Sequence, residues 1–270
     1  IIRSAANLQG IRTALVTTMN VYEIINHTNL IVTKEAIEKI VTREDLTYDE
    51  AYRVMNEIMS GKSTPTQNAA FLAALSTKSA KFETIDEISG CAAAMREHAI
   101  PVDTGDLKCL EIVGTGGDGF ATVNLSTMGS VAAAAAGVKI VKHGNRAASS
   151  TCGAADVLED LGLPMDLKPE AVGEIGDEVG ITFAFARTFH PAMRFVGPIR
   201  AVLGIPCVFN FLGPLTNPAN PAHVAIGCAN RKVSPIMAAV YASRDQSGLV
   251  YTSHEGLDEL APTGPISVWE

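Results

Sequence analysis

Apolar residues recur at helical spacing through the first third of the chain. Ile85, Ile88, Ala92 and Met95, for example, follow one another three or four positions apart and fall on one face of a helix. Threonines followed three residues later by Glu or Gln are typical of helix starts, and they occur at Thr47–Glu50, Thr64–Gln67 and Thr84–Glu87. We therefore predict a small N-terminal helical domain over residues 1–100, in which residues 1–32 receive no assignment.

The pattern changes after Pro101, where short apolar runs alternate with helix-like segments. The runs, rich in Val, Ile and Phe, predict strands at 109–113, 138–141, 181–185, 206–209, 224–228 and 249–252. The segments between them predict helices at 126–136, 154–161, 169–179, 190–203 and 234–243. Short buried strands separated by helices indicate a mostly parallel sheet. The predicted class is α/β, with a larger α/β domain over residues 101–270.

Composition and charge restrict the possible partners. The 270 residues are 47% hydrophobic and 19% charged, with a net charge of −8. A nucleic-acid groove needs a surplus of Lys and Arg, so we expect no nucleic acid as partner. The longest small apolar run, 131–138, is too short for a membrane span. Five cysteines without a CxxC spacing favour a reducing, cytoplasmic location.

A glycine-rich loop carries the clearest chemical signal. Gly114-Thr115-Gly116-Gly117-Asp118-Gly119 follows a predicted strand and precedes a predicted helix. Backbone amides in such a loop, with a helix N-terminus behind them, form a cradle for phosphate. Asp118 could accept a hydrogen bond from a ribose hydroxyl or from a metal-bound water. The loop matches neither the dinucleotide fingerprint nor the phosphate loop that contains Gly-Lys-Ser/Thr, and a simple tight turn is the alternative.

Polar residues after the next strands extend this candidate site. Asn124, Ser126 and Thr127 open the next predicted helix, where Ser126 or Thr127 would cap it and all three could face a phosphate. Residues 142–146, Lys-His-Gly-Asn-Arg, follow a strand at the end where open α/β sheets bind ligands. Lys142 offers a point charge to phosphate. A solvated charged loop is the alternative.

Two further pairs are weaker signals when taken alone. His190 and Arg200 lie ten residues apart after Pro191, roughly on one face if that segment is one helix. Arg200 could hold a carboxylate through two hydrogen bonds, or be an ordinary surface arginine. Asp258 and Glu259 could supply oxygen ligands to Mg²⁺, or be surface acids. The sequence has no Cys/His cluster with zinc-ligand spacing. It also has no Gly-x-Ser-x-Gly elbow, which disfavours catalysis by a serine nucleophile.

Taken in order, these motifs resemble the anthranilate phosphoribosyltransferases, a family of nucleoside phosphorylase-like phosphoribosyltransferases. Any one of the strings is weak, whereas the ordered set is specific and runs from Thr33 to Glu270. The matching strings are residues 114–118, 124–127, 142–146, 155–159, 190–193, 209–218 and 256–259.

The resemblance implies a reaction and a set of site residues. The family transfers the phosphoribosyl group of phosphoribosyl pyrophosphate to the amine of anthranilate, in a homodimer formed partly through the helical domain. Phosphoribosyl pyrophosphate would be held by Gly114, Thr115, Gly116, Gly117, Asp118, Asn124, Ser126, Thr127, Lys142 and Ser150. Mg²⁺ would be bound by Ser126, Asp258 and Glu259. Anthranilate would be bound by Gly114, His143, Asn145, His190 and Arg200. No general acid or base is assigned, because an aryl amine is already a nucleophile.

The chain departs from the family at two places, and two alternatives stay open. Arg187 stands where the family often has proline, and family members continue beyond Glu270, so the α/β domain is expected to be incomplete at its C-terminus. A pyrimidine nucleoside phosphorylase-like enzyme would use inorganic phosphate and need no acidic pair. A non-enzymatic, nucleic-acid-binding relative would need a basic cleft. The transferase is favoured over both alternatives by residues 142–146, by the acids at 258–259 and by the net negative charge of the chain.

Overall fold

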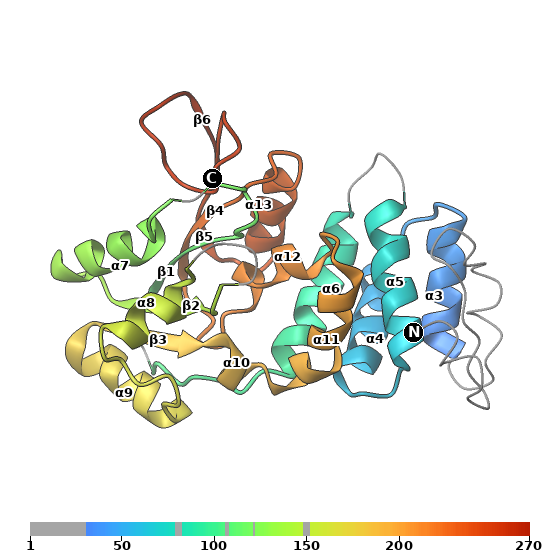
Figure 1. The fold of residues 1–270 in the computed structure, drawn as a ribbon, viewed down its shortest axis with the longest axis horizontal. Coiled ribbons are helices and arrows are strands. Elements are labelled where there is room, and N and C mark those ends of the chain that lie inside the picture. Colours follow the sequence, from blue (N-terminus) through green and yellow to red (C-terminus); the bar gives the residue numbers. More distant parts are fainter. Residues whose placement is uncertain (1–30, 79–82, 106–107, 121, 148–151) are drawn as a thin grey trace.

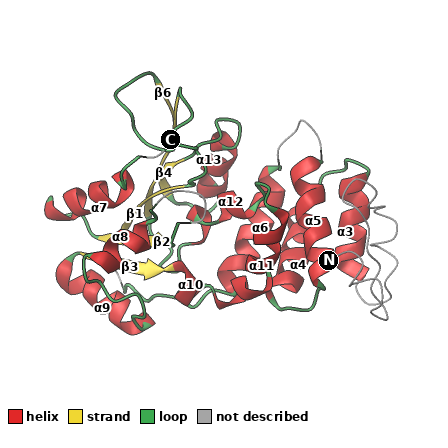
Figure 2. Ribbon diagram, viewed as in Figure 1, coloured by secondary structure: helices red, strands yellow, loops and turns green. Residues whose placement is uncertain are grey.

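The computed structural model describes residues 31–78, 83–105, 108–120, 122–147 and 152–270 (Figure 1). The first part is a group of helices, and the second is a sheet with helices around it (Figure 2). No helix in these ranges is both long and apolar enough to cross a membrane.

Four helices form the N-terminal part: α3 (Ile31–Val41), α4 (Tyr48–Met59), α5 (Pro65–Thr77) and α6 (Ile85–Glu97). The predicted helix starts at Thr47, Thr64 and Thr84 are confirmed. Each threonine side chain accepts from the backbone N–H three residues on, and each threonine backbone N–H donates to the side chain of that same residue. The buried Lys78 side chain forms ion pairs with Glu87 at 2.6 Å and Asp45 at 2.7 Å.

The second part contains a six-stranded sheet of order β3-β2-β1-β4-β5-β6. Its strands are β1 (Leu110–Gly114), β2 (Ile140–Gly144), β3 (Ile181–Phe185), β4 (His223–Gly227), β5 (Ser247–Ser253) and β6 (Ile266–Trp269). The first five pair in parallel, and only β6 pairs antiparallel, so the mostly parallel sheet is confirmed. The chain moves outward from β1 to β3 and then returns to β4 on the other side of β1. This reversal creates a switch point between β1 and β4, where open sheets bind ligands.

Helices and short helical turns connect the strands. They are α7 (Leu125–Ala135), α8 (Ala154–Asp160), α9 (Pro169–Val179), α10 (Ala186–Phe189), η2 (Pro191–Phe195), α11 (Gly197–Leu203), α12 (Phe209–Leu212), η3 (Pro214–Thr216) and α13 (Ser234–Ala242). One hydrophobic core continues from the helical part into the sheet, and it includes Ile58, Phe71, Leu212, Ile226 and Met237. The two parts are therefore held together by shared apolar burial.

Three local predictions were wrong, and one strand, β6, was missed. The run at 206–209 is no strand: Asn210 accepts from the Cys207 backbone N–H at 3.0 Å, which favours a turn leading into α12. The helix expected at 190–203 divides at Val196 into η2 and α11, which carry Pro191 and Pro198 in their first turns.

The third error concerns the cap of α7. Asn124, and not Ser126 or Thr127, stands at the N-cap, and the structure gives it no side-chain cap hydrogen bond. Ser126 and Thr127 lie within the first turn of the helix, so their hydroxyl groups are available for other partners.

Candidate active site

The glycine loop lies at the carboxyl end of β1, at the switch point between β1 and β4. Gly116, Gly117 and Gly119 have φ values of 67°, 76° and 77°, a left-handed backbone that favours glycine. Thr115 ties the loop to the end of β4, since its N–H donates to Gly227 O at 2.9 Å and its Oγ1 accepts from Ala229 N at 3.1 Å. The sheet thus fixes the start of the loop.

Asp258 reaches this loop from the segment that follows β5. Its Oδ2 accepts from Gly116 N at 2.6 Å. The contact needs two strand ends without side chains: a Cβ on Gly114 would lie 2.1 Å from Asp258 Oδ2, and a Cβ on Gly227 would lie 1.6 Å from Asp258 O. Sequence reasoning missed the role of Gly227, for which the only signal was a glycine at the end of a strand.

The acidic side chains of the site, Asp118, Asp258 and Glu259, are close enough to repel one another, and Asp258 and Glu259 are partly desolvated. Burial, and the nearby charge of Asp118, raise the pKa of Asp258 to about 6. Burial, and then the charge of Asp258, raise the pKa of Glu259 to about 7. The acids are therefore short of a positive partner, and a divalent cation would supply one.

The donors present fit Mg²⁺ and do not form a closed metal cage. Among the described residues no group of three or more His, Cys, Asp or Glu side chains is arranged to hold a metal. Mg²⁺ in enzymes commonly uses one or two carboxylates and completes its shell with water and substrate phosphate. The side chains of Asp258, Glu259 and Ser126 provide such an open set of hard oxygen donors.

Lys142 joins the acids to the start of α7. Its buried Nζ donates to Ile112 O at 2.8 Å and to Ser126 Oγ at 3.1 Å. Burial lowers the pKa of Lys142 to about 8, although the nearby carboxyl groups of Glu111 and Glu259 act to raise it. The backbone of Ser126 in turn hydrogen-bonds to Glu259. Thr127, in the same turn, has a buried Oγ1 without a hydrogen-bond partner in the part of the chain described.

His143 and His190 form a second buried group beside Lys142. Their ring centroids lie 5.0 Å apart. Burial lowers the pKa of His143 to about 3 and that of His190 to about 4, so both rings are neutral at pH 7. They hydrogen-bond to the backbone of Gly213 and Thr216 respectively, and each Nε2 is buried without a partner within the described ranges. Nδ1 is then the donor, which leaves two Nε2 lone pairs as acceptors.

The other predicted site residues are less constrained. Asn145 is exposed, and its Oδ1 accepts from Arg146 N at 2.9 Å. Arg146 pairs with Asp156 and Glu159, which makes it part of the support for the loop. Arg200 lies on α11 with its Cζ 5.4 Å from the centre of the Phe209 ring. Ser150 lies outside the described residues. The structure therefore gathers Gly116, Asp118, Ser126, Lys142, Asp258 and Glu259 in one network and gives no contact that draws Asn145 or Arg200 into it.

Comparison with known proteins first defines the class. Residues 34–99 match the helical bundle domain of the glycosyl transferase family, and residues 106–270 match the a/b domain of that family. Residues 1–43 also match a model of the ribosomal protein L4/L1 family.

Individual relatives narrow the assignment. An anthranilate phosphoribosyltransferase from Arthrobacter sp. is 52% identical over 87% of this chain and 65% of its own length. The crystal structure of the enzyme from Thermus thermophilus has a TM-score of 0.80 at 44% identity and covers 87% of this chain and 72% of that one. The enzyme from Saccharomyces cerevisiae, in complex with PRPP and Mg, has a TM-score of 0.81 at 30% identity over 88% of this chain and 70% of that one. The chain belongs to the anthranilate phosphoribosyltransferase family of glycosyl transferases. It spans about two thirds of the length of these relatives.

Proposed function

We propose that this chain transfers the phosphoribosyl group of phosphoribosyl pyrophosphate to the amine of anthranilate, releasing pyrophosphate. One observation carries the proposal: the Gly116 amide, Ser126, Lys142 and the two acids meet at the carboxyl end of β1 in a chain of this family. The yeast relative was solved with PRPP and Mg, which supports the same donor here.

The donor side of the reaction requires a place for negative charge. Bond cleavage at the anomeric carbon leaves charge on the departing pyrophosphate, and fixed donors lower the energy of that transition state. The amide of Gly117 and the Lys142 ammonium are such donors. When bound, Mg²⁺ would neutralise part of the same charge, and Asp258, Glu259 and Ser126 would hold it. Asp118 would accept from the ribose hydroxyls.

The acceptor side requires a polar wall that does not protonate the nucleophile. His143 and His190 are neutral and present Nε2 acceptors, which suit the N–H groups of an aryl amine. Asn145 and Arg200 would complete the acceptor site, with the Arg200 guanidinium on the carboxylate of anthranilate. Positioning the amine in line with C1 of the sugar then accounts for much of the rate.

A homodimer and a cytoplasmic location complete the proposal. Val41, Tyr48 and Ile85 are large apolar side chains exposed on the helical part, and they support pairing through that part. The described cysteines are thiols, which suits a reducing compartment. Sedimentation velocity would test the pairing, and a monomer at micromolar concentration would contradict it.

The decisive experiment mixes the purified chain with phosphoribosyl pyrophosphate, Mg²⁺ and anthranilate, and follows the loss of anthranilate fluorescence. Replacing Asp258 and Glu259 together by Ala should remove at least about 99% of the turnover while the fold is retained, because the site loses its metal-binding carboxylates. Asp166→Asn, an exposed acid outside the site, is the matched control. Unchanged turnover in the double variant would show that Asp258 and Glu259 do not bind a metal ion that the reaction needs. The absence of any turnover in the unmodified chain would contradict the proposed function.

A further inference from the structure

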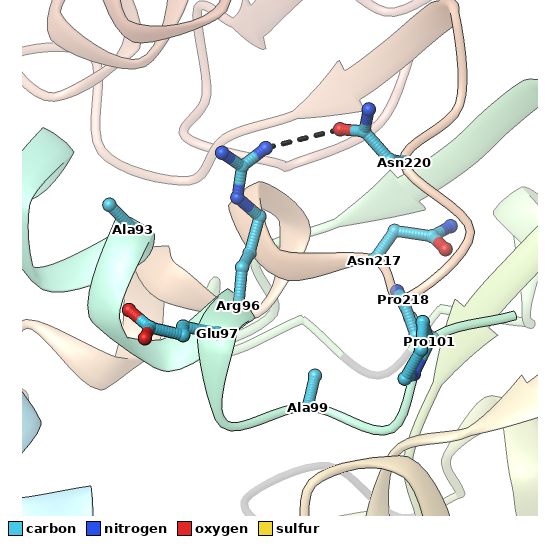
Figure 3. Close-up of a pocket in the computed structure, with 8 residues that line it drawn as sticks. All are labelled: Ala93, Arg96, Glu97, Ala99, Pro101, Asn217, Pro218 and Asn220. Atoms are coloured by element: carbon cyan, nitrogen blue, oxygen red, sulfur yellow. Dashed lines mark hydrogen bonds between the residues drawn. The ribbon is translucent and has the colours of Figure 1, made fainter.

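A cavity of about 370 Å³ lies at the junction of the helical part and the sheet. None of its described lining residues belongs to the glycine loop, the acidic pair or the histidine pair. The C-terminal end of α6 forms one wall and the turn after η3 forms another (Figure 3). Its volume falls within the range of small-molecule sites, which often lie between domains.

The cavity combines an apolar surface with two charged side chains, Arg96 and Glu97. Ala93, Ala99, Pro101 and Pro218 contribute the apolar part. The Arg96 side chain rises between the two walls, and its Nη1 donates to Asn220 Oδ1 at 3.1 Å (Figure 3). No carboxylate in the described ranges lies within salt-bridge distance of Arg96.

Two other polar side chains that line the cavity, Asn217 and Glu97, already form hydrogen bonds within the protein. Asn217 donates to Val141 O at 2.9 Å and accepts from Ala219 N at 2.9 Å, so it builds the wall. Glu97 accepts from the Tyr52 hydroxyl. The guanidinium of Arg96 therefore remains the group on the cavity surface that is suited to a ligand.

A second arginine lies behind the first. Arg244 donates through Nη1 to Leu215 O at 2.9 Å, while its buried Nη2 has no partner among the residues described. Burial, and then the charge of Arg96, lower the pKa of Arg244 to about 10. Two cations thus repel each other beside a cavity.

The buried acid at this junction, Glu111, does not neutralise the charges of Arg96 and Arg244. Glu111 lines a narrow cleft next to the cavity together with Arg96, Tyr241 and Gln246. Burial raises the pKa of Glu111 to about 8, so its carboxyl group is largely neutral at pH 7. Among the described residues, the two arginines of the junction therefore face one charged acid, Glu97, which already accepts from Tyr52.

We propose that the junction cavity is a second ligand site, and that it binds a small organic carboxylate. The carboxylate would receive two hydrogen bonds from the Arg96 guanidinium, a geometry that arginine favours. The apolar body, an aromatic ring in the best case, would lie against Ala93, Ala99, Pro101 and Pro218. Neither pyrophosphate nor a sugar phosphate suits these walls, because they offer few donors.

The test uses benzoate as the probe and isothermal titration calorimetry with the whole chain, in the absence of Mg²⁺ and of a phosphoribosyl donor. Arg96→Gln should raise the Kd for benzoate at least about tenfold, since it removes the charged donor. Ala93→Leu should do the same by filling the cavity, and it leaves every charge in place. Both substitutions keep good helix formers in α6. Circular dichroism would confirm that each variant folds.

Two controls separate this cavity from other sites. Arg53→Gln removes an exposed positive charge from α4 and should leave the Kd unchanged. Arg200→Gln should abolish only benzoate binding at the proposed acceptor site and should leave the binding that depends on Arg96, because Arg200 does not line the cavity. Wild-type affinity in both cavity variants, loss of all benzoate binding in Arg200→Gln, or a lack of saturable binding at millimolar benzoate would overturn the proposal. The assay needs no turnover, so its outcome is independent of the proposed reaction.

Discussion

Two buried lysines show how the helical part and the candidate site differ. Both residues are buried, since Lys78 is 4% and Lys142 is 2% exposed. Burial alone would lower the pKa of Lys78, but the hydrogen bonds that it donates to Asp45 and Glu87 raise the pKa above the usual value. Lys142 contacts a carbonyl and a hydroxyl, and its pKa falls to about 8.

The difference separates a charge that is neutralised within the fold from one that the proposed function would use. Lys78 is neutralised within the fold, and its removal would leave Glu87 buried without its cation. Lys142 is incompletely neutralised, which is costly unless an anionic substrate binds. Four predictions test this contrast, from the largest expected effect to the smallest.

Lys78→Met should lower the free energy of unfolding by about 3–5 kcal/mol, because a buried pair loses one partner. Urea denaturation measures the change. Lys39→Met is the matched control, since the pair of Lys39 with Glu50 is about one-third exposed and such pairs contribute about 1 kcal/mol or less. Equal effects at both lysines would contradict the structural role of Lys78.

Lys142→Met should reduce turnover about 10²–10³-fold, equivalent to about 2.7–4 kcal/mol in the transition state. Its free energy of unfolding should stay the same or rise, because a poorly compensated buried charge is removed. The fluorescence assay and urea denaturation report the two quantities. A large loss of stability with normal turnover in the remaining folded protein would make Lys142 a structural residue.

Lower pH should destabilise the site more than the helical part. His143 has a folded pKa of about 3 against an unfolded value of about 6.5, so only the unfolded chain gains a proton as the pH falls below 6.5. Its contribution is present above pH 6.5 and is lost below it, by about 2 kcal/mol at pH 5. His143→Asn should therefore show a smaller fall in stability between pH 7 and pH 5 than the wild type.

The matched control for this pH dependence is His98→Asn in the helical part, followed by the same denaturation series. Identical slopes for the wild type and His143→Asn would show that the imidazole of His143 is not held neutral.

Gly227→Ala should reduce turnover roughly tenfold, since its Cβ would meet the backbone of Asp258 and displace the acid from the glycine loop. Gly129→Ala, where the added Cβ meets nothing within 4 Å, should leave turnover intact and stabilise α7 by about 0.5–1 kcal/mol. The turnover of both variants is measured by steady-state kinetics. Normal turnover in Gly227→Ala would show that the backbone position of Asp258 is not critical for the reaction.

The sequence by itself determined most of the helical part and the residue types of the candidate site. Thr47, Thr64 and Thr84 mark their helices because a cap depends on residues only three apart. β3 and α9 were predicted at their observed bounds for a similar local reason. The glycine loop and the acids at 258–259 were identified from residue type and order alone.

Only the tertiary structure decided how distant residues meet. It placed β4 beside β1, so that Gly227 leaves space for Asp258 and Asp258 reaches the Gly116 amide. It also buried Lys142 without a full set of counter-charges and brought Arg96 close to Arg244. Sequence patterns report local backbone preference and burial, whereas strand order and desolvation arise from contacts between residues far apart in the chain, and these contacts set the charges of the site.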